Sequence, residues 1–153
     1  QAFDLAFHHQ NKKNFELAKD LYEKIIKINP DNKNIQFNLG ITYEELNQVN
    51  KAIECYQKVI HLDPLFIPSY NNLALIFHKL GENNKALYFF KKIIKINPKY
   101  IKAYNNLGLI YADLGHGASR SQRHKVTESR RSRGHLIIWL TRSRATARRR
   151  GSC

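Results

Sequence analysis

Few residues in this sequence have the types and spacing that catalysis or metal binding requires. His8 and His9 could serve as metal ligands, but adjacent side chains on a helix point about 100° apart, which disfavours a shared metal. Glu44 and Glu45 could act as an acid–base pair, yet they diverge in the same way and fit a solvated face better. The sequence contains no glycine-rich phosphate loop and no nucleophile motif. We therefore predict no enzyme, no cofactor and no metal site.

The residues that point to a function are asparagines that recur at a fixed spacing along the chain. Asn38, Asn72 and Asn106 are each separated by 34 positions, and Asp4 takes the matching place before them. A carboxamide has both a donor and an acceptor, so a row of carboxamides suits the backbone of an extended peptide. The alternative is that asparagine is merely tolerated at an exposed place, and Asp4 interrupts the row at one end.

Apolar residues recur with the same spacing beside the polar row. One helical turn away are Phe7, Ile41, Leu75 and Leu109, while Phe3 and Phe37 stand where later units have Asn71 and Asn105. Exposed aromatic side chains usually mark a binding site. The alternative is that neighbouring helices partly cover Leu75 and Leu109. The candidate peptide-binding site comprises Asn38, Asn72, Asn106, Asn71, Asn105, Phe3, Phe7, Phe37, Ile41 and Leu75.

These rows belong to a repeat of 34 residues that fixes the fold class. The run from Ile25 to Pro30 recurs unchanged from Ile93 to Pro98, two periods later. Five further sets of residues, namely leucines, small residues, alanines, aromatics and prolines, recur at the same interval of 34 residues. They are Leu5, Leu39, Leu73 and Leu107; Ala6, Gly40, Ala74 and Gly108; Ala18, Ala52 and Ala86; Tyr22, Tyr56 and Phe90; and Pro30, Pro64 and Pro98.

Each period predicts two amphipathic helices, because its apolar residues lie at helical spacing. Prolines end the second helix of each pair. Gly81 and Gly115 mark the turn inside a pair, where Asn47 and Lys13 stand in the earlier units. Since glycine costs a helix about 1 kcal/mol relative to alanine, Gly40 and Gly108 indicate close approach of a partner helix, with Ala18, Ala52 and Ala86 as the opposing small surfaces. Tyr22, Tyr56 and Phe90 are expected to fill the gap toward the next unit.

This pattern resembles the tetratricopeptide repeat family over roughly residues 1–115. The resemblance implies an all-α fold, a right-handed superhelix (α-solenoid) of antiparallel helix pairs in which the first helix of each pair lines a concave groove. We expect an array over residues 1–116, with units 1–32, 33–66 and 67–100 and a half unit 101–115, as a fragment of a longer protein. The function that follows is a non-enzymatic scaffold that binds a protein or peptide partner.

Two groups of proteins with such repeats suggest more specific functions for this chain. The asparagine row looks like the ladder in the repeat arm of O-linked N-acetylglucosamine transferases, so the chain could be such an arm without its catalytic domain. Other family members grip the terminal carboxylate of chaperone tails with lysine and arginine. Lys102 and Asn72 match parts of that clamp, but Phe37 and Asn106 stand where basic residues are needed. We therefore do not expect carboxylate clamping.

A basic tail follows the repeats at residues 117–153. It contains ten arginines and Lys125 but only one acidic residue, Glu128. The tail therefore carries 11 − 1 = +10 of the net charge of +14. Runs such as Arg148-Arg149-Arg150, with Trp139 available for stacking, could bind nucleic acid. The alternative, which we favour, is a non-native sequence from a shifted reading frame, because composition changes abruptly in mid-repeat. Most of it is then expected to be disordered.

Cysteine content and hydropathy indicate the cellular environment of the protein. Cys55 and Cys153 form no disulfide framework or zinc spacing, which indicates a reducing, cytoplasmic environment. The apolar segment Leu136–Leu140 is far shorter than the roughly 20 residues that span a bilayer. We therefore expect no membrane partner.

Overall fold

A computed structural model of the protein describes residues 1–115. Gln1–Ile110 form one compact unit, and residues 111–115 are assigned to another. The first unit contains α1 (Ala2–Asn11), α2 (Phe15–Ile28), α3 (Lys33–Glu45), α4 (Val49–Leu62), α5 (Ile67–Lys79) and α6 (Asn83–Ile96). Residues 101–115 are helical as well, and no strand occurs within the described range.

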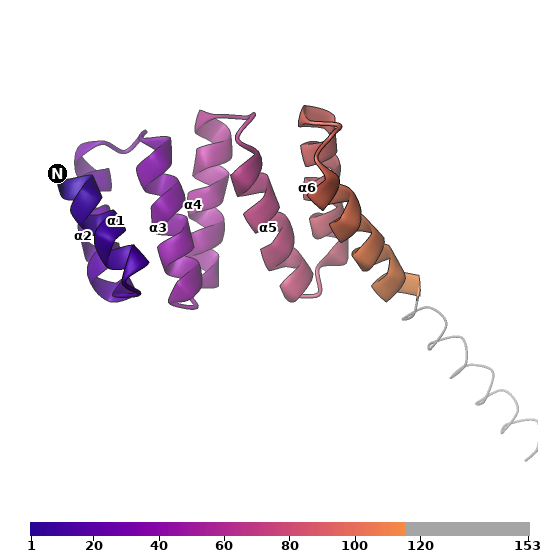
Figure 1. Ribbon diagram of the computed structural model, residues 1–153, viewed down its shortest axis with the longest axis horizontal. Coiled ribbons are helices and arrows are strands. Elements are labelled where there is room, and N and C mark those ends of the chain that lie inside the picture. The colour runs from indigo at the N-terminus through magenta and orange to yellow at the C-terminus, as the bar shows by residue number, and fades with distance from the viewer. Residues whose placement is uncertain (116–153) are drawn as a thin grey trace, which may run out of the picture. The chain divides into compact units, whose positions relative to one another are not determined.

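The helices form consecutive pairs that stack side by side. α1 packs on α2, α3 on α4 and α5 on α6, while α2 contacts α3 and α4 contacts α5 between pairs. Figure 1 shows α1, α3 and α5 on the side facing the viewer, with α2, α4 and α6 behind them. This arrangement confirms the all-α helical repeat solenoid that the 34-residue period predicts.

The core repeats the small and aromatic positions of the sequence. The alanines at the predicted contact points and the rings of Tyr22, Tyr56 and Phe90 are completely buried. A Cβ atom added to Gly40 would lie 2.8 Å from Cε1 of Tyr56 and 3.1 Å from Cβ of Cys55. The glycine therefore does permit close approach of α4. Its nearest neighbours are Tyr56 and Cys55, and not Ala52 as expected from the sequence. At Gly108 no described atom lies within 4 Å of an added Cβ atom, so the close approach predicted there is wrong within the described residues.

The second helix of each pair ends two residues before a proline. α2, α4 and α6 end at Ile28, Leu62 and Ile96, and the residues that follow leave the helical conformation. The next helix then begins within a few residues, and at α3 the Asn32 side chain accepts hydrogen bonds from the backbone N–H groups of Asn34 and Ile35 at 3.1 and 3.2 Å. This N-cap satisfies two donors that an isolated helix leaves unpaired.

The turn inside each pair requires a residue in the left-handed conformation. Lys13, Asn47 and Gly81 have φ values of 61°, 57° and 75°, at positions one period apart. The turn predicted at these three positions is thus present, whereas residue 115 is still helical.

We expect Lys13→Gly to stabilise the fold by about 0.5 kcal/mol. Left-handed backbone costs a non-glycine residue about 1 kcal/mol, and part of the gain is lost because glycine makes the unfolded chain more flexible. Urea unfolding followed by circular dichroism measures the change. The reciprocal variant Gly81→Lys should destabilise the protein, and equal stability of all three proteins would contradict the strain at this turn.

None of the helices within residues 1–115 is long and apolar enough to cross a membrane. The predictions for the tail, including nucleic-acid binding by its arginines and Trp139 and the apolar segment Leu136–Leu140, lie outside the described residues.

Candidate functional site

The predicted polar row lies on the first helices of successive pairs. Asn38 is on α3, Asn72 on α5 and Asn106 in the helical residues that follow α6, and all three are half-buried. Asp4 on α1 is exposed. The row therefore combines three partly accessible carboxamides with one carboxylate at its start.

Asn38 also has a structural role that the sequence did not indicate. Its side-chain Nδ2 donates to the carbonyl oxygen of Asn34 at 2.9 Å, one turn earlier in α3. Its own carbonyl oxygen accepts from Oγ1 of Thr42 at 2.8 Å and from Nε2 of Gln10 at 3.4 Å. One side-chain N–H is therefore used within α3, while Oδ1 has no hydrogen bond to any described residue and is available to a ligand.

The side chain of Asn72 interacts with the buried phenol of Tyr56. Burial raises the pKa of the Tyr56 phenol most, and the nearby Glu44 carboxylate raises it further. A hydrogen bond between the Tyr56 hydroxyl and the Asn72 side chain lowers this pKa to a smaller extent. The Tyr56 hydroxyl donates to Oε2 of Glu44 at 3.2 Å. Glu44 is thus not merely the solvated residue that sequence analysis expected, because it links α3 to α4.

The preceding unit contains a similar buried pair that sequence analysis missed. The hydroxyl of Tyr22 donates to Oε1 of Gln10 at 2.9 Å, and burial raises the pKa of Tyr22 to about 12. Gln10 is buried and lies one period before Glu44. The sequence signal for this pair is a polar residue four positions after the in-phase small residue, Gln10 after Ala6 and Glu44 after Gly40, together with the in-phase tyrosine.

The remaining asparagines of the candidate site have side chains that are free of internal hydrogen bonds. Asn71 and Asn106 are half-buried and Asn105 is exposed, and their side chains make no hydrogen bond to other residues within 1–110. Both the donor and the acceptor of each carboxamide are therefore available. These three side chains have the chemistry that a polypeptide backbone requires.

The aromatic members of the candidate site divide into packed and exposed rings. Phe37 is half-buried and lies 5.7 Å from the ring of Tyr56 and 5.1 Å from that of Phe66. Phe3 contacts Tyr22 at 6.0 Å and stacks on Phe7 at 6.1 Å. These contacts make Phe3 and Phe37 part of the packing between helices, so only part of each ring is accessible.

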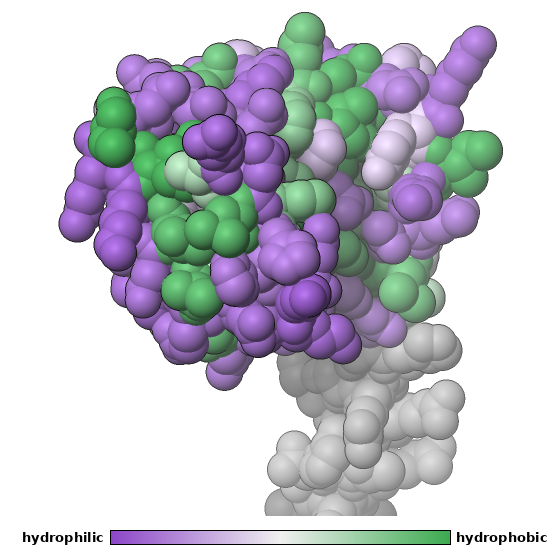
Figure 2. All heavy atoms as spheres, turned by 60° about the vertical axis from the view of Figure 1, so that its left-hand side comes forward, coloured by the Kyte–Doolittle hydropathy of each residue, from purple (hydrophilic) through white to green (hydrophobic). Residues whose placement is uncertain are grey.

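Phe7 offers more surface, since 44% of it is exposed. Ile41 and Leu75 are partly buried against the core, whereas Leu109 is 55% exposed. Hydrophobic side chains also gather among hydrophilic ones on the side where the chain begins (Figure 2). Leu5 on α1 and Leu17 on α2 are exposed as well. The first helices thus carry accessible apolar side chains as well as the free carboxamides.

Within residues 1–115 no cluster of three or more His, Cys, Asp or Glu side chains could hold a metal ion. The rings of His8 and His9 lie 5.7 Å apart at an interplanar angle of 79°. Glu44 is held by Tyr56 and by Nζ of Lys79 at 3.3 Å, while Glu45 is exposed.

Family models of tetratricopeptide repeats match the chain at residues 3–32, 34–66, 55–88 and 75–115. Among solved structures it is similar to the first such domain of Spaghetti (RPAP3) bound to the HSP90 peptide SRMEEVD, with a TM-score of 0.69 and 18% identity over 74% of this chain and 90% of that one. It is also similar to the second such domain of human RPAP3 in complex with the HSP70 peptide SGPTIEEVD, with a TM-score of 0.65 and 19% identity over 72% and 92% of the two chains. A MamA mutant matches with a TM-score of 0.59 and 26% identity over 63% and 70%. No curated protein sequence matches the chain.

Proposed function

This chain belongs to the tetratricopeptide repeat family across residues 3–115, and on that premise we propose that it is a non-enzymatic scaffold that binds an extended polypeptide along the face of its first helices. The observation that carries this proposal is the set of free carboxamides on that face. Asn71, Asn105 and Asn106 have unused donors and acceptors, and Asn38 keeps a free Oδ1. Such groups pair with the N–H and C=O of a peptide whatever its sequence.

Two further observations support a polypeptide occupant. Both RPAP3 domains similar to this chain hold peptides of chaperones. Ile41 and Leu75 are partly accessible and follow Asn38 and Asn72 by one helical turn, and the exposed ring of Phe7 follows Asp4 in the same way, so these three can take apolar side chains of the same segment. In this proposal, amides hold the backbone and the apolar residues select its side chains.

The charge of the site favours an internal segment over a terminal carboxylate. Phe37 and Asn106 are neutral where a carboxylate clamp needs basic residues, and Lys102 is the remaining cation of that pattern. We therefore propose that affinity does not depend on a free C-terminus in the peptide. Amidating the end of a bound peptide should leave its affinity unchanged.

Replacing Asn38, Asn72 and Asn106 together by alanine should weaken peptide binding by about tenfold to a thousandfold, since three hydrogen bonds are lost. A net contribution of about 0.5–1.5 kcal/mol per lost hydrogen bond gives this range. The ligand is first selected on a peptide array with the full chain, and affinities are then measured by calorimetry. The matched control replaces Asn50 and Asn84, which are exposed on the second helices one period apart.

A second variant separates binding from folding, because Asn38 and Asn72 also make internal hydrogen bonds. Replacing Asn105 and Asn106 by alanine removes no bond within the described residues. Loss of affinity in this variant at an unchanged melting temperature supports the proposal. Unchanged affinity in both variants would remove it.

The alternative functions give different results in the same assay. Binding that is lost when the chain is ended at Gly115, and that falls steeply with salt, belongs to the arginine-rich tail and to nucleic acid. A transferase arm would bind peptides as proposed here, so adjoining coding sequence for a catalytic domain distinguishes it.

A further inference from the structure

Positive charge is concentrated in the last part of the described chain. Residues 1–82 contain nine lysines and ten acidic residues, whereas residues 83–110 contain six lysines and no aspartate or glutamate. Four of these six lysines lie on α6, at positions 85, 91, 92 and 95. Among α2, α4 and α6, the last is therefore the one second helix without a carboxylate.

Three of the lysines share the solvent side of α6 with an aromatic ring. Because successive residues of a helix are rotated by about 100°, one arc of about 100° holds Tyr88, Lys91, Lys92 and Lys95. Tyr88, Lys91 and Lys95 are exposed and Lys92 is half-buried, while the buried residues of α6 lie on the other side of the helix. We call these four residues the α6 face.

The Tyr88 ring is held in place but remains accessible. It meets the ring of Phe89 edge-on, with the centroids 5.2 Å apart and an interplanar angle of 80°, and Nζ of Lys92 lies 5.3 Å from its centre. Despite these contacts, 55% of Tyr88 is exposed. A further ring can therefore stack on it beside the lysine.

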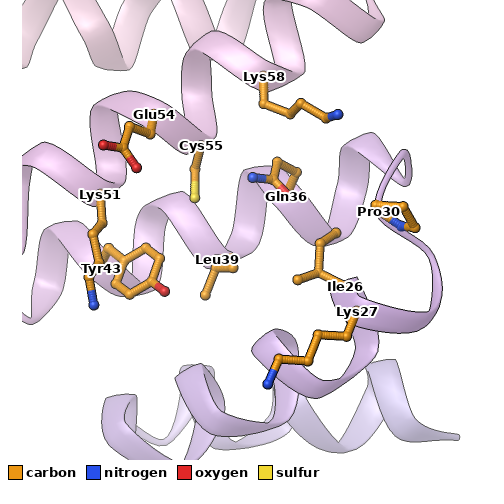
Figure 3. A pocket seen from close by; sticks show the side chains of 10 residues that line it. All are labelled: Ile26, Lys27, Pro30, Gln36, Leu39, Tyr43, Lys51, Glu54, Cys55 and Lys58. Atoms are coloured by element: carbon orange, nitrogen blue, oxygen red, sulfur yellow. The ribbon is translucent and has the colours of Figure 1, made fainter.

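The other second helices carry a carboxylate where α6 has this ring. One period earlier Glu54 on α4 takes the place of Tyr88, and Figure 3 shows it on the turn between Lys51 and Lys58. Two periods earlier the place belongs to Asp20 on α2, whose Oδ1 lies 3.4 Å from a lysine Nζ of the same helix. Both helices thus place a negative charge among their lysines, and α6 does not.

The three lysines of the α6 face make no ion pair with a described residue. Two carboxylates nearby are themselves paired. Glu82, which precedes α6, binds Nζ of the α6 lysine at position 85 at 2.5 Å. Burial raises the pKa of Tyr70 most, while Lys92 lowers it and Asp63 raises it, so Asp63 also lies near this face. Its Oδ2 is 2.5 Å from Nζ of Lys33. Counting both pairs, five lysines meet two carboxylates, and the face is basic.

Single-stranded nucleic acid is the polyanion that uses both features of the α6 face. Its phosphates pair with lysine side chains, and its bases stack on exposed aromatic rings whatever their sequence. An acidic peptide would use the lysines but not the ring. An anionic bilayer takes up an apolar helix face, whereas Tyr88 is the only apolar residue among the exposed residues of α6.

We propose that the α6 face binds single-stranded nucleic acid, with one base stacked on Tyr88 and the adjacent phosphates on Lys91, Lys92 and Lys95. This binding uses residues of the repeat array and is separate from any binding by the tail. It is also independent of the polypeptide held along the first helices, because α6 packs on α5 with its buried side and turns the α6 face to solvent.

Two double variants of equal charge test the lysines. The probe is a fluorescent oligothymidylate of about twelve nucleotides, and its affinity for the full chain is measured by anisotropy at several salt concentrations. Replacing Lys92 and Lys95 by glutamine removes two phosphate contacts, so the slope of log affinity against log salt should become shallower by about 1.4. Replacing Lys24 and Lys27, at the same positions of α2 two periods earlier, should leave the slope nearly unchanged. Both variants keep the tail, so equal changes would contradict the proposal.

A change at Tyr88 tests the ring at constant charge. Tyr88→Ala should weaken binding of the oligothymidylate by about fivefold to a hundredfold, the range for loss of one stacked base. Tyr88→Phe keeps the ring and should bind as the unchanged protein does. Because Tyr88 is exposed, both variants should keep the melting temperature of the unchanged protein. Full binding by Tyr88→Ala would overturn the proposal.

Two further probes separate nucleic acid from other polyanions. Polyglutamate with the charge of the oligothymidylate, and vesicles that contain phosphatidylserine, should bind more weakly than the oligothymidylate and should not respond to Tyr88→Ala. Equal or tighter binding of either probe would assign the face to an acidic protein or to a membrane and overturn the proposal. Replacing Asn105 and Asn106 by alanine should leave the oligothymidylate unaffected, so the two proposed sites succeed or fail separately.

Discussion

Replacing Tyr56 by alanine should lower the free energy of unfolding by about 3–5 kcal/mol, the range for large buried aromatic side chains. The Tyr56 ring is completely buried and packs against Gly40 of α3 and the ring of Phe37. Its hydroxyl also joins Glu44 to Asn72 of the next unit. Removing it leaves a cavity where two repeats meet, and one unit cannot bury its apolar stripe alone.

The control for this change keeps the ring. Tyr56→Phe removes only the hydroxyl and should cost about 1 kcal/mol, because Phe90 occupies the matching place in the next unit without one. Urea unfolding monitored by circular dichroism gives both values. If Tyr56→Ala cost no more than Tyr56→Phe, the ring would not be the contact that holds the repeats together.

Enlarging Gly40 to valine should destabilise the fold by about 2–3 kcal/mol, as overpacking of a filled core does. An added Cβ atom would already lie 2.8 Å from Cε1 of Tyr56, and a valine adds two further methyl groups at that contact. The Tyr56 ring is held by neighbours on several sides and cannot move away without disturbing them.

Gly108 supplies the matched control, because it occupies the same repeat position two periods later. No described atom lies within 4 Å of a Cβ added there, so Gly108→Val should change the free energy of unfolding by less than about 0.5 kcal/mol. Thermal unfolding of the two variants side by side measures the contrast. Similar losses in both would show that helix propensity, and not contact with Tyr56, explains the glycine.

The fold could be predicted from the sequence because the same pattern of helix-forming and turn residues occurs in each repeat. The 34-residue period, the in-phase prolines and the left-handed turn positions each specify helix ends, and stacked units leave few alternative arrangements. The partner of Gly40 was predicted less well. Ala52 is in phase with it, but the helix rotation that brings Tyr56 against the glycine depends on packing and is not visible in residue spacing.

The candidate site was predictable only as a set of positions. Spacing places Asn38, Asn72 and Asn106 on equivalent faces, but it does not show which hydrogen bonds the carboxamides make. Asn38 binds its own helix and Asn72 binds Tyr56, because these partners come within reach only after folding.

The most direct test of peptide binding along the first helices is a nuclear magnetic resonance titration of the isotope-labelled full chain with a peptide selected on the array. We predict that the side-chain amide signals of Asn71, Asn105 and Asn106 and the methyl signals of Ile41 and Leu75 shift as the peptide is added. Signals of α2, α4 and α6 should change less. Shifts confined to those second helices or to residues 117–153, with the asparagine side chains unchanged, would contradict the account.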